Sequence, residues 1–162
     1  MGPKKKRKVI MDINPQWITG FVDGEGCFSV SILRNNSLRY GHQLQPEFVV
    51  TQHKLDANVL YALKDYFKVG SVVVNHGERL CYKVKNIDHF ITVIIPFFEK
   101  HELKTKRRIE FLRFRKICLL LKAGRHLESQ EGFEKVLDLA KKLRINEKNY
   151  QESIKRFEET GE

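Results

Sequence analysis

The sequence has few cysteines, and their spacing indicates neither a disulfide framework nor a zinc site. Its three cysteines, Cys27, Cys81 and Cys118, are odd in number and far apart, without a Cys-x-x-Cys pair. The six histidines are also scattered, and no His-x-x-x-His pair indicates a transition-metal site. We therefore expect reduced, packed thiols in an intracellular protein.

Long hydrophobic runs are absent as well. No run of about 18 apolar residues is present, so we expect no membrane-spanning helix, and no secretory signal is visible. The 162 residues are 41% hydrophobic, which suits one globular domain with a substantial core.

Acidic residues are outnumbered by basic ones, and part of the excess lies in one short segment. The formal net charge is +10. Residues 3–9, Pro-Lys-Lys-Lys-Arg-Lys-Val, resemble a basic nuclear-localisation peptide commonly grafted onto expressed proteins; without its five basic residues the chain keeps 25 against 20 acids, or +5. We interpret residues 1–12 as a disordered nuclear-localisation tag and linker, which would place the tagged chain in the nucleus. A natural basic arm that grips phosphates is the alternative.

Residues 17–28 are predicted to begin as a helix and end as a strand. Asn14 followed by Pro15 is typical of a helix start, because Asn caps the first turn and Pro needs no amide hydrogen there. Gly20 and Gly24 lie on the same side of this helix, and each costs about 1 kcal/mol relative to alanine. A second backbone packed closely against them would explain both glycines. The opposite face is apolar, with Ile18 and Val22 among its residues.

Two acids follow at the C-terminal end of this helix. The helix dipole disfavours the carboxylates of Asp23 and Glu25 there, which suggests a bound cation. Each feature also has an ordinary interpretation, since the glycine pair could reflect close packing alone and Asp-Gly-Glu-Gly could be a polar turn.

Taken together, residues 18–26 closely resemble the signature of the LAGLIDADG homing endonucleases. Gly20, Asp23 and Gly26 match the signature, and Glu25 stands at its second acidic position. The similarity extends from Asn14 to about Leu143, and three further segments carry it: Thr51-Gln52, Leu103-Lys104-Thr105-Lys106 with Arg108 and Phe111, and His126 to Phe133. One departure is His53-Lys54-Leu55-Asp56, which lacks an arginine that some relatives have; Lys54 could substitute for it.

The periodicity after Gly26 predicts an α+β fold. Residues 28–33 alternate with Phe28 inward and Ser29 outward, and a returning strand is expected at 43–52. A helix with Leu55 on its apolar face follows at 55–67, then a hairpin of strands 71–75 and 80–85. A helix at 90–95, capped by Asp88 and ended by Pro96, completes a helix-strand-strand-helix-strand-strand-helix core with a four-stranded antiparallel sheet. Two C-terminal helices are expected, anchored at 109–121 and 133–143. The domain is assigned to residues 13–145, and residues 146–162 to a charged, loosely docked helix or tail.

One face of the predicted sheet is left bare and polar, which suits double-stranded DNA. Ten Lys or Arg between Glu99 and Arg125 could contact phosphates, and polar side chains could read bases in a major groove. The run Val72-Val73-Val74 could be buried on both faces or form part of that surface. The residues predicted to contact DNA are Ser29, Ser31, Leu33, Asn35, Arg39, Gln43, Gln45, Glu47, Val73, Asn75, Lys83, Lys85, Lys106 and Arg107.

The resemblance implies metal-dependent phosphodiester hydrolysis. Glu25 and the backbone carbonyl of Gly24 would bind Mg²⁺ or Mn²⁺, because hard cations prefer oxygen ligands. Lys104 would hold positive charge near the scissile phosphate and Gln52 would orient the water. Asp23 would be mainly structural, beside the helix contact.

One motif supplies one catalytic acid, whereas cutting two strands needs two, so we expect a two-fold homodimer through the motif helix. Its interface is predicted to contain Trp17, Gly20, Phe21, Asp23 and Gly24. The paired Glu25 carboxylates would then share two or more ions, which relieve their repulsion. Such a dimer would cut a long pseudo-palindromic site across the minor groove, and the resemblance implies that the cuts leave short 3′ overhangs.

Three alternatives remain at this point. An intron maturase of the same fold would bind RNA, and a catalytically dead module would bind DNA without turnover. A different nuclease class is weakly indicated by Asp88 with Glu102-Leu103-Lys104, although this triplet follows a predicted helix rather than a strand. The resemblance places native relatives in mitochondria or chloroplasts.

Overall fold

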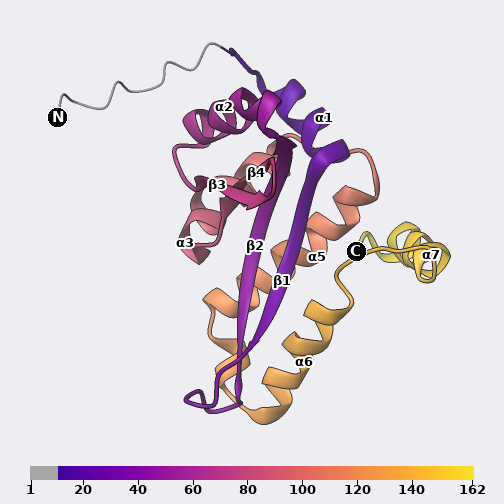
Figure 1. The fold of residues 1–162 in the computed structure, drawn as a ribbon. Helices are drawn as coiled ribbons and strands as arrows, with labels where there is room; N and C mark the ends of the chain where they lie inside the picture. Colours follow the sequence, from indigo (N-terminus) through magenta and orange to yellow (C-terminus); the bar gives the residue numbers. More distant parts are fainter. Residues whose placement is uncertain (1–10) are drawn as a thin grey trace.

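The computed structural model describes residues 11–162 as an α+β domain (Figure 1). The predicted nuclear-localisation peptide lies outside the described residues. The expected core order is confirmed by α1 (Pro15–Glu25), β1 (Gly26–Arg34), β2 (His42–His53), α2 (Ala57–Phe67), β3 (Ser71–His76) and β4 (Arg79–Val84). The strands form one antiparallel sheet in the order β1-β2-β4-β3, so β1 is an edge strand.

The start of α1 and its junction with β1 follow from local chemistry. The Asn14 side chain accepts a hydrogen bond from the Trp17 amide at 2.9 Å, and Pro15 occupies the first turn. Gly26 joins the helix directly to the strand. A Cβ atom at Gly26 would lie 2.6 Å from a methyl carbon of Val22, so only glycine fits there without movement.

The two faces of the sheet divide as the alternation predicts. Phe28 pairs with Phe48, which pairs with Val84, and all three are buried on the face covered by helices. The rings of Phe111 and Phe114 lie 5.4 and 5.2 Å from that of Phe28. The helix α5 (Lys106–Lys122) that carries them therefore packs behind β1, and the opposite face of the sheet is left open.

The helical region before α5 differs from the prediction. Asn86, not Asp88, caps its first turn, since the Asn86 side chain accepts from the amides of Asp88 and His89. Pro96 does not end it either. A short helix α3 (Ile87–His89) leads into a π-helical turn, η2 (Phe90–Ile94), and helix continues through Pro96 in α4 (Ile95–Lys100). Pro96 falls in the first turn of α4, where a missing amide hydrogen is tolerated.

Two smaller expectations about apolar residues need correction. Leu55 does not belong to the apolar face of α2, because it lies in a 3-10 turn, η1 (Lys54–Asp56), and is strongly exposed. The valine run in β3 is not buried on both faces: Val73 and Val74 are exposed, and only Val72 packs against the core.

The C-terminal region contains the two expected helices, and the segment expected as a charged helix or tail also forms a helix. After the 3-10 turn η3 (Arg125–Leu127), α6 (Gln130–Lys141) begins earlier than predicted, because Ser129 caps it through the Gly132 amide. The tail forms α7 (Tyr150–Thr160), in which only Ser153 is buried. Within residues 11–162, none of the helices is both long and apolar enough to cross a bilayer.

Candidate functional site

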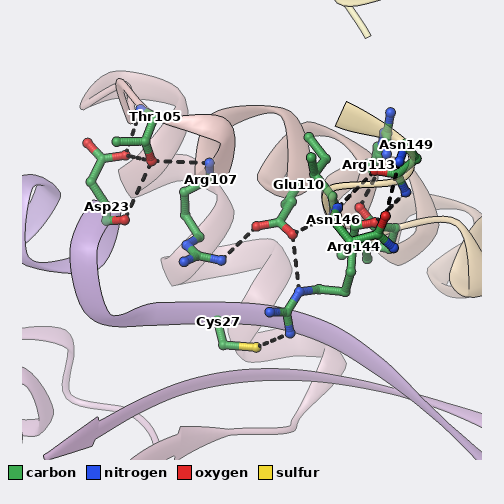
Figure 2. A network of polar contacts seen from close by, with 11 residues as sticks. Asp23, Cys27, Thr105, Arg107, Glu110, Arg113, Arg144, Asn146 and Asn149 are labelled. Atoms are coloured by element: carbon green, nitrogen blue, oxygen red, sulfur yellow. Dashed lines mark hydrogen bonds and ion pairs between the residues drawn. The ribbon is translucent and has the colours of Figure 1, made fainter. Parts of the chain in front are cut away.

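The end of the motif helix is clamped to the start of α5. The Asp23 carboxylate accepts hydrogen bonds from the Lys104 amide at 2.9 Å. It also accepts from the Thr105 amide at 3.0 Å and the Thr105 hydroxyl at 2.8 Å (Figure 2). Thr105 in turn caps α5 through the Arg107 amide. Asp23 thus lies against the helix dipole of α1 but at the favourable N-terminal end of α5, and needs no cation for its stability.

Glu25 has different surroundings from Asp23 although it is only two residues away. Glu25 and Gly24 are both exposed at the last turn of α1. In this last turn the Val22 carbonyl accepts from the Gly26 amide and the Asp23 carbonyl from the Thr105 hydroxyl. The Gly24 carbonyl, next in the chain, would be the second oxygen donor beside the Glu25 carboxylate. This donor set suits a hard divalent cation. Within residues 11–162 no group of three His, Cys, Asp or Glu comes together.

Gln52 and Lys104 lie at the same end of the sheet as Glu25. Gly26, which follows Glu25, pairs with Val50, and Gln52 is two residues further along β2. Lys104 is brought there by the bonds of its amide to Asp23, while its side chain remains exposed. The three residues predicted to be catalytic thus lie at the same end of the sheet as the α1–β1 junction.

The segment after Gln52 is held by the turn between β3 and β4. The Glu78 carbonyl accepts from the Lys54 amide at 2.7 Å, and the Glu78 carboxylate contacts the Lys54 ammonium at 2.8 Å and the His53 imidazole at 3.2 Å. These two hydrogen-bonding partners, Lys54 first and His53 second, hold the pKa of the Glu78 carboxyl below its ordinary value. The ammonium of Lys54 is thus engaged within the protein.

Most residues predicted to contact DNA share the open face of the sheet. The register pairs Ser29 with Glu47, Ser31 with Gln45 and Leu33 with Gln43 across β1 and β2. Lys83, opposite Val49, and Val73 belong to the same face by alternation. Two side chains there contact the end of β4: Glu47 lies 3.7 Å from the Lys85 ammonium, and Gln45 donates to the Lys85 carbonyl at 2.8 Å.

The remaining predicted contacts lie at turns and helix ends. Asn35 stabilises the β1–β2 loop by accepting from the Ser37 amide and hydroxyl, while Arg39 lies over the Tyr40 ring. Asn75 is exposed at the β3 end, and Lys106 is exposed at the first turn of α5. Arg107 is different, because its side chain is 12% exposed and its guanidinium donates to Glu110.

The basic residues between 99 and 125 do not support the argument drawn from their number. α5 covers the buried face of the sheet, away from the open face. Six of these cations also form ion pairs with nearby acids: Arg107–Glu110, Arg108–Glu102, Arg115–Glu99, Lys116–Glu162, Lys122–Asp88 and Arg125–Glu128. Most of these basic residues thus lie behind the sheet, and their number does not indicate contacts with phosphates on the open face.

Sequence reasoning missed a buried carboxylate beside this site. Glu110 is fully buried and accepts hydrogen bonds from Arg107, Arg144 and the Ile145 amide (Figure 2). Its i, i+3 spacing from Arg107 is a weak signal, shared by many exposed helix pairs. Nothing near Arg144 in the sequence indicates this partner.

The outer side of α1 is unfilled in the single chain. A Cβ atom at Gly20 or Gly24 would meet no atom within 4 Å, apart from its own helix backbone and chain neighbours. The rings of Trp17 and Phe21 stack 4.8 Å apart, and Trp17 is exposed. Packing within the chain therefore does not account for the two glycines.

Comparisons with known proteins give one consistent result. The sequence profile described as "LAGLIDADG endonuclease" matches residues 18–118. A probable intron-encoded endonuclease 2 of Neurospora crassa is 31% identical over 128 residues, which cover 78% of this chain and 28% of that protein. The DNA endonuclease I-CeuI of Chlamydomonas moewusii is 26% identical over 136 residues, or 79% of this chain and 61% of the relative. The chain thus spans about a quarter of the length of the first relative.

Solved structures agree. The crystal structure of the homing endonuclease I-TnaI superposes with a TM-score of 0.79 and 39% identity, over 90% of this chain and 99% of the other. I-SmaMI bound to an uncleaved DNA target in the presence of calcium ions gives a TM-score of 0.79 at 29% identity, over 91% of this chain and 49% of that chain.

Proposed function

This chain belongs to the LAGLIDADG endonuclease family, and we propose that it is a site-specific homing endonuclease that makes metal-dependent double-strand breaks in DNA. The observation that carries the proposal is the clamp of Asp23 on Lys104 and Thr105. It brings an exposed acid, Glu25, and an exposed ammonium, that of Lys104, to one end of an open polar sheet. Hydrolysis of a phosphodiester needs both an activated water and a cation beside the phosphate.

Divalent metal is part of this proposal. The Glu25 carboxylate and the Gly24 carbonyl would hold Mg²⁺ or Mn²⁺, with two or more ions for each pair of subunits. The ion would supply a water of lowered pKa and charge neutralisation at the phosphate. Lys104 would bind a phosphoryl oxygen, and Gln52 would orient the attacking water by hydrogen bonding.

Two copies of the chain would build the active centre. The open side of α1 at Gly20 and Gly24 supports a two-fold contact between motif helices, with Trp17, Phe21 and Asp23 at its margins. The chain also covers only 49% of I-SmaMI, so that protein has room for a second region of the same size. The two Glu25 carboxylates would lie near the axis, where shared cations relieve their repulsion.

The substrate of this dimer would be a long, nearly palindromic duplex. I-SmaMI has been crystallised with uncleaved and with cleaved DNA, which supports DNA as the partner. The open faces of the two sheets would lie in major grooves on either side of the cuts, which would fall across the central minor groove and leave short 3′ overhangs. Relatives named as intron-encoded support an origin in an intron, in a mitochondrial or chloroplast genome.

Cleavage of a randomised palindromic duplex library with Mg²⁺ tests the proposal. We expect this chain to cut a narrow set of sites, and Glu25→Gln to bind those sites without cutting them, because the amide lacks the charge that holds the metal. Asp138→Asn, on the exposed surface of α6, is a matched control that should cut like the unaltered chain. If neither the unaltered chain nor Glu25→Gln cuts DNA while both bind RNA, the nuclease proposal fails and the maturase function takes its place.

A further inference from the structure

We propose that Arg144 contacts a DNA phosphate at the edge of the active centre, and that the buried carboxylate of Glu110 positions it there. The inference rests on the proposed function and adds a binding residue that lies outside the family signature. Three observations support it: the burial of Glu110, the place of Arg144 beside β1, and the contrast in exposure between the two arginines that share Glu110.

Glu110 is a fixed anchor. Its side chain is 0% exposed, and it accepts from Arg107 Nη1 at 2.6 Å, Arg144 Nε at 3.1 Å and the Ile145 amide at 2.9 Å. A buried carboxylate is tolerated only when it is paired and hydrogen-bonded. Because two guanidinium groups share one carboxylate, the cluster carries an excess positive charge, and the Arg144 side chain exposes part of it.

Arg144 brings this excess charge to the open face of the sheet. Its Nη1 atom lies 2.8 Å from Cys27 Sγ (Figure 2). Cys27 follows Glu25 by two residues and pairs with Val49, which pairs with Lys83 on the open face. β1 is the edge strand, so a side chain from the C-terminal region can reach Cys27 around that edge. The guanidinium therefore lies at the row of the open face nearest the α1–β1 junction.

The two arginines on Glu110 differ in exposure. Arg107 is 12% exposed and lies inside the protein, whereas the Arg144 side chain is 54% exposed. The contacts to Glu110 and Cys27 occupy two of the five N–H donors of Arg144. A guanidinium held at Nε by a buried carboxylate presents its remaining donors in a fixed orientation, which suits a phosphate.

The backbone around Arg144 is fixed as well. Leu143 and Ile145 are buried on either side of it. The Arg144 carbonyl accepts from the Asn149 side chain at 3.0 Å, and the Leu143 carbonyl accepts from Arg113 at 3.4 Å. The position of Arg144 is thus set by packing and hydrogen bonds that do not involve DNA, so the contact would be preorganised.

The salt dependence of DNA binding separates this role from a structural one. The probe is a mixed-sequence duplex long enough for both subunits, titrated with the full chain at several salt concentrations. Each lost phosphate contact lowers the slope of log K against log salt by about 0.9, and a dimer loses two, so Arg144→Ala should have a slope shallower by about 1.8. Arg115→Ala, which removes the same charge from an ion pair behind the sheet, should keep the original slope.

Two further variants complete the experiment. Arg144→Lys should restore most of the slope, because it keeps the charge, although it loses the forked contact to Glu110 and Cys27. Glu110→Gln should bind with the full slope but cleave the selected site more slowly, since the charge remains while its orientation is lost. Thermal unfolding without DNA shows whether each variant is folded.

The outcomes distinguish the two proposals. If Arg144→Ala keeps the original slope while the unaltered chain binds and cuts DNA, the role of Arg144 is overturned and the proposed function stands. The same conclusion follows if Arg144→Ala lowers only the melting temperature. If the unaltered chain does not bind duplex DNA, the proposed function fails, and this inference fails with it.

Discussion

At the scale of single residues, the two acids of the motif show how surroundings divide similar side chains between roles. The Asp23 carboxylate accepts hydrogen bonds from the amides of Lys104 and Thr105, so its charge is compensated within the protein. Glu25 is exposed at the free end of the same helix. A carboxylate that the protein leaves uncompensated at a helix C-terminus is the better candidate for a metal ligand.

Glu110 provides a stability prediction at this scale. Glu110→Ala would leave the buried Arg107 guanidinium without its partner, and we expect a loss of about 3–5 kcal/mol in the free energy of unfolding. Urea denaturation measures this loss. Glu102→Ala, which removes an acid from an exposed ion pair with Arg108, should change the free energy by less than about 1 kcal/mol. Equal effects of the two changes would contradict the account.

The three thiols should differ in reactivity. Burial raises the pKa of the Cys81 and Cys118 thiols, whereas Cys27 is partly accessible beside the active centre. Only the thiolate reacts with alkylating reagents, so at mildly alkaline pH the folded protein should be labelled at Cys27. Bound DNA should protect that residue. Mass spectrometry of the labelled peptides checks both points, and labelling of Cys118 in folded protein would be inconsistent with the packing described.

At the scale of elements, α1 has one side that the folded single chain leaves unpacked and that the proposed dimer would bury. The side of α1 that carries Gly20 and Gly24 packs against nothing in the single chain. Alanine should therefore be accommodated by the monomer, and should even favour its helix by up to about 1 kcal/mol. In the proposed dimer the same methyl group would stand between two closely packed helices.

Gly20→Ala should consequently stabilise the monomer, or leave its stability unchanged, and destabilise the proposed dimer. We expect an equal or higher melting temperature for the monomer, together with weaker dimerisation and slower double-strand cleavage, measured by sedimentation velocity and plasmid linearisation. Lys64→Ala, on the exposed surface of α2, is the matched control and should change neither dimerisation nor cleavage. Unchanged dimerisation of Gly20→Ala would place the subunit contact elsewhere.

The elements also show which parts of the fold could be predicted from the sequence. The Asn14 cap and the alternation of Phe28 with Ser29 depend on neighbours a few residues apart, and both were confirmed. The passage of helix through Pro96 depends on a π-helical turn before it, which single-residue preferences do not indicate.

The candidate site, too, has a part that could be predicted from the sequence and a part that could not. The motif located the segment of Glu25 and Lys104, but the bonds from Asp23 that join them span more than 80 positions in the sequence, and the link from Arg144 to Cys27 spans 117. Such long-range pairs leave no periodic pattern. Arg107 shows the converse, because a basic residue in a basic segment looked free for DNA until its buried partner became visible.

At the scale of the whole molecule, the two sides of the sheet have different tasks. The helices behind it carry many charges that are balanced by local ion pairs, and the open face carries the polar side chains available for a ligand. Removing a paired charge from the back should therefore affect DNA binding little. Removing a cation that reaches the open face should weaken DNA binding strongly even when, like Arg144, it is also paired with an acid. This difference in position underlies the comparison of Arg115 with Arg144.

The central claim is that one chain supplies half of the active centre. The mass of the complex between this chain and its cleavable duplex, measured with Ca²⁺ in place of Mg²⁺ to slow cutting, tests that claim most directly. We expect two chains for each duplex, with the dimer population and the cleavage rate falling together on dilution. A complex of one chain with one duplex that linearises DNA when Mg²⁺ is added would contradict it.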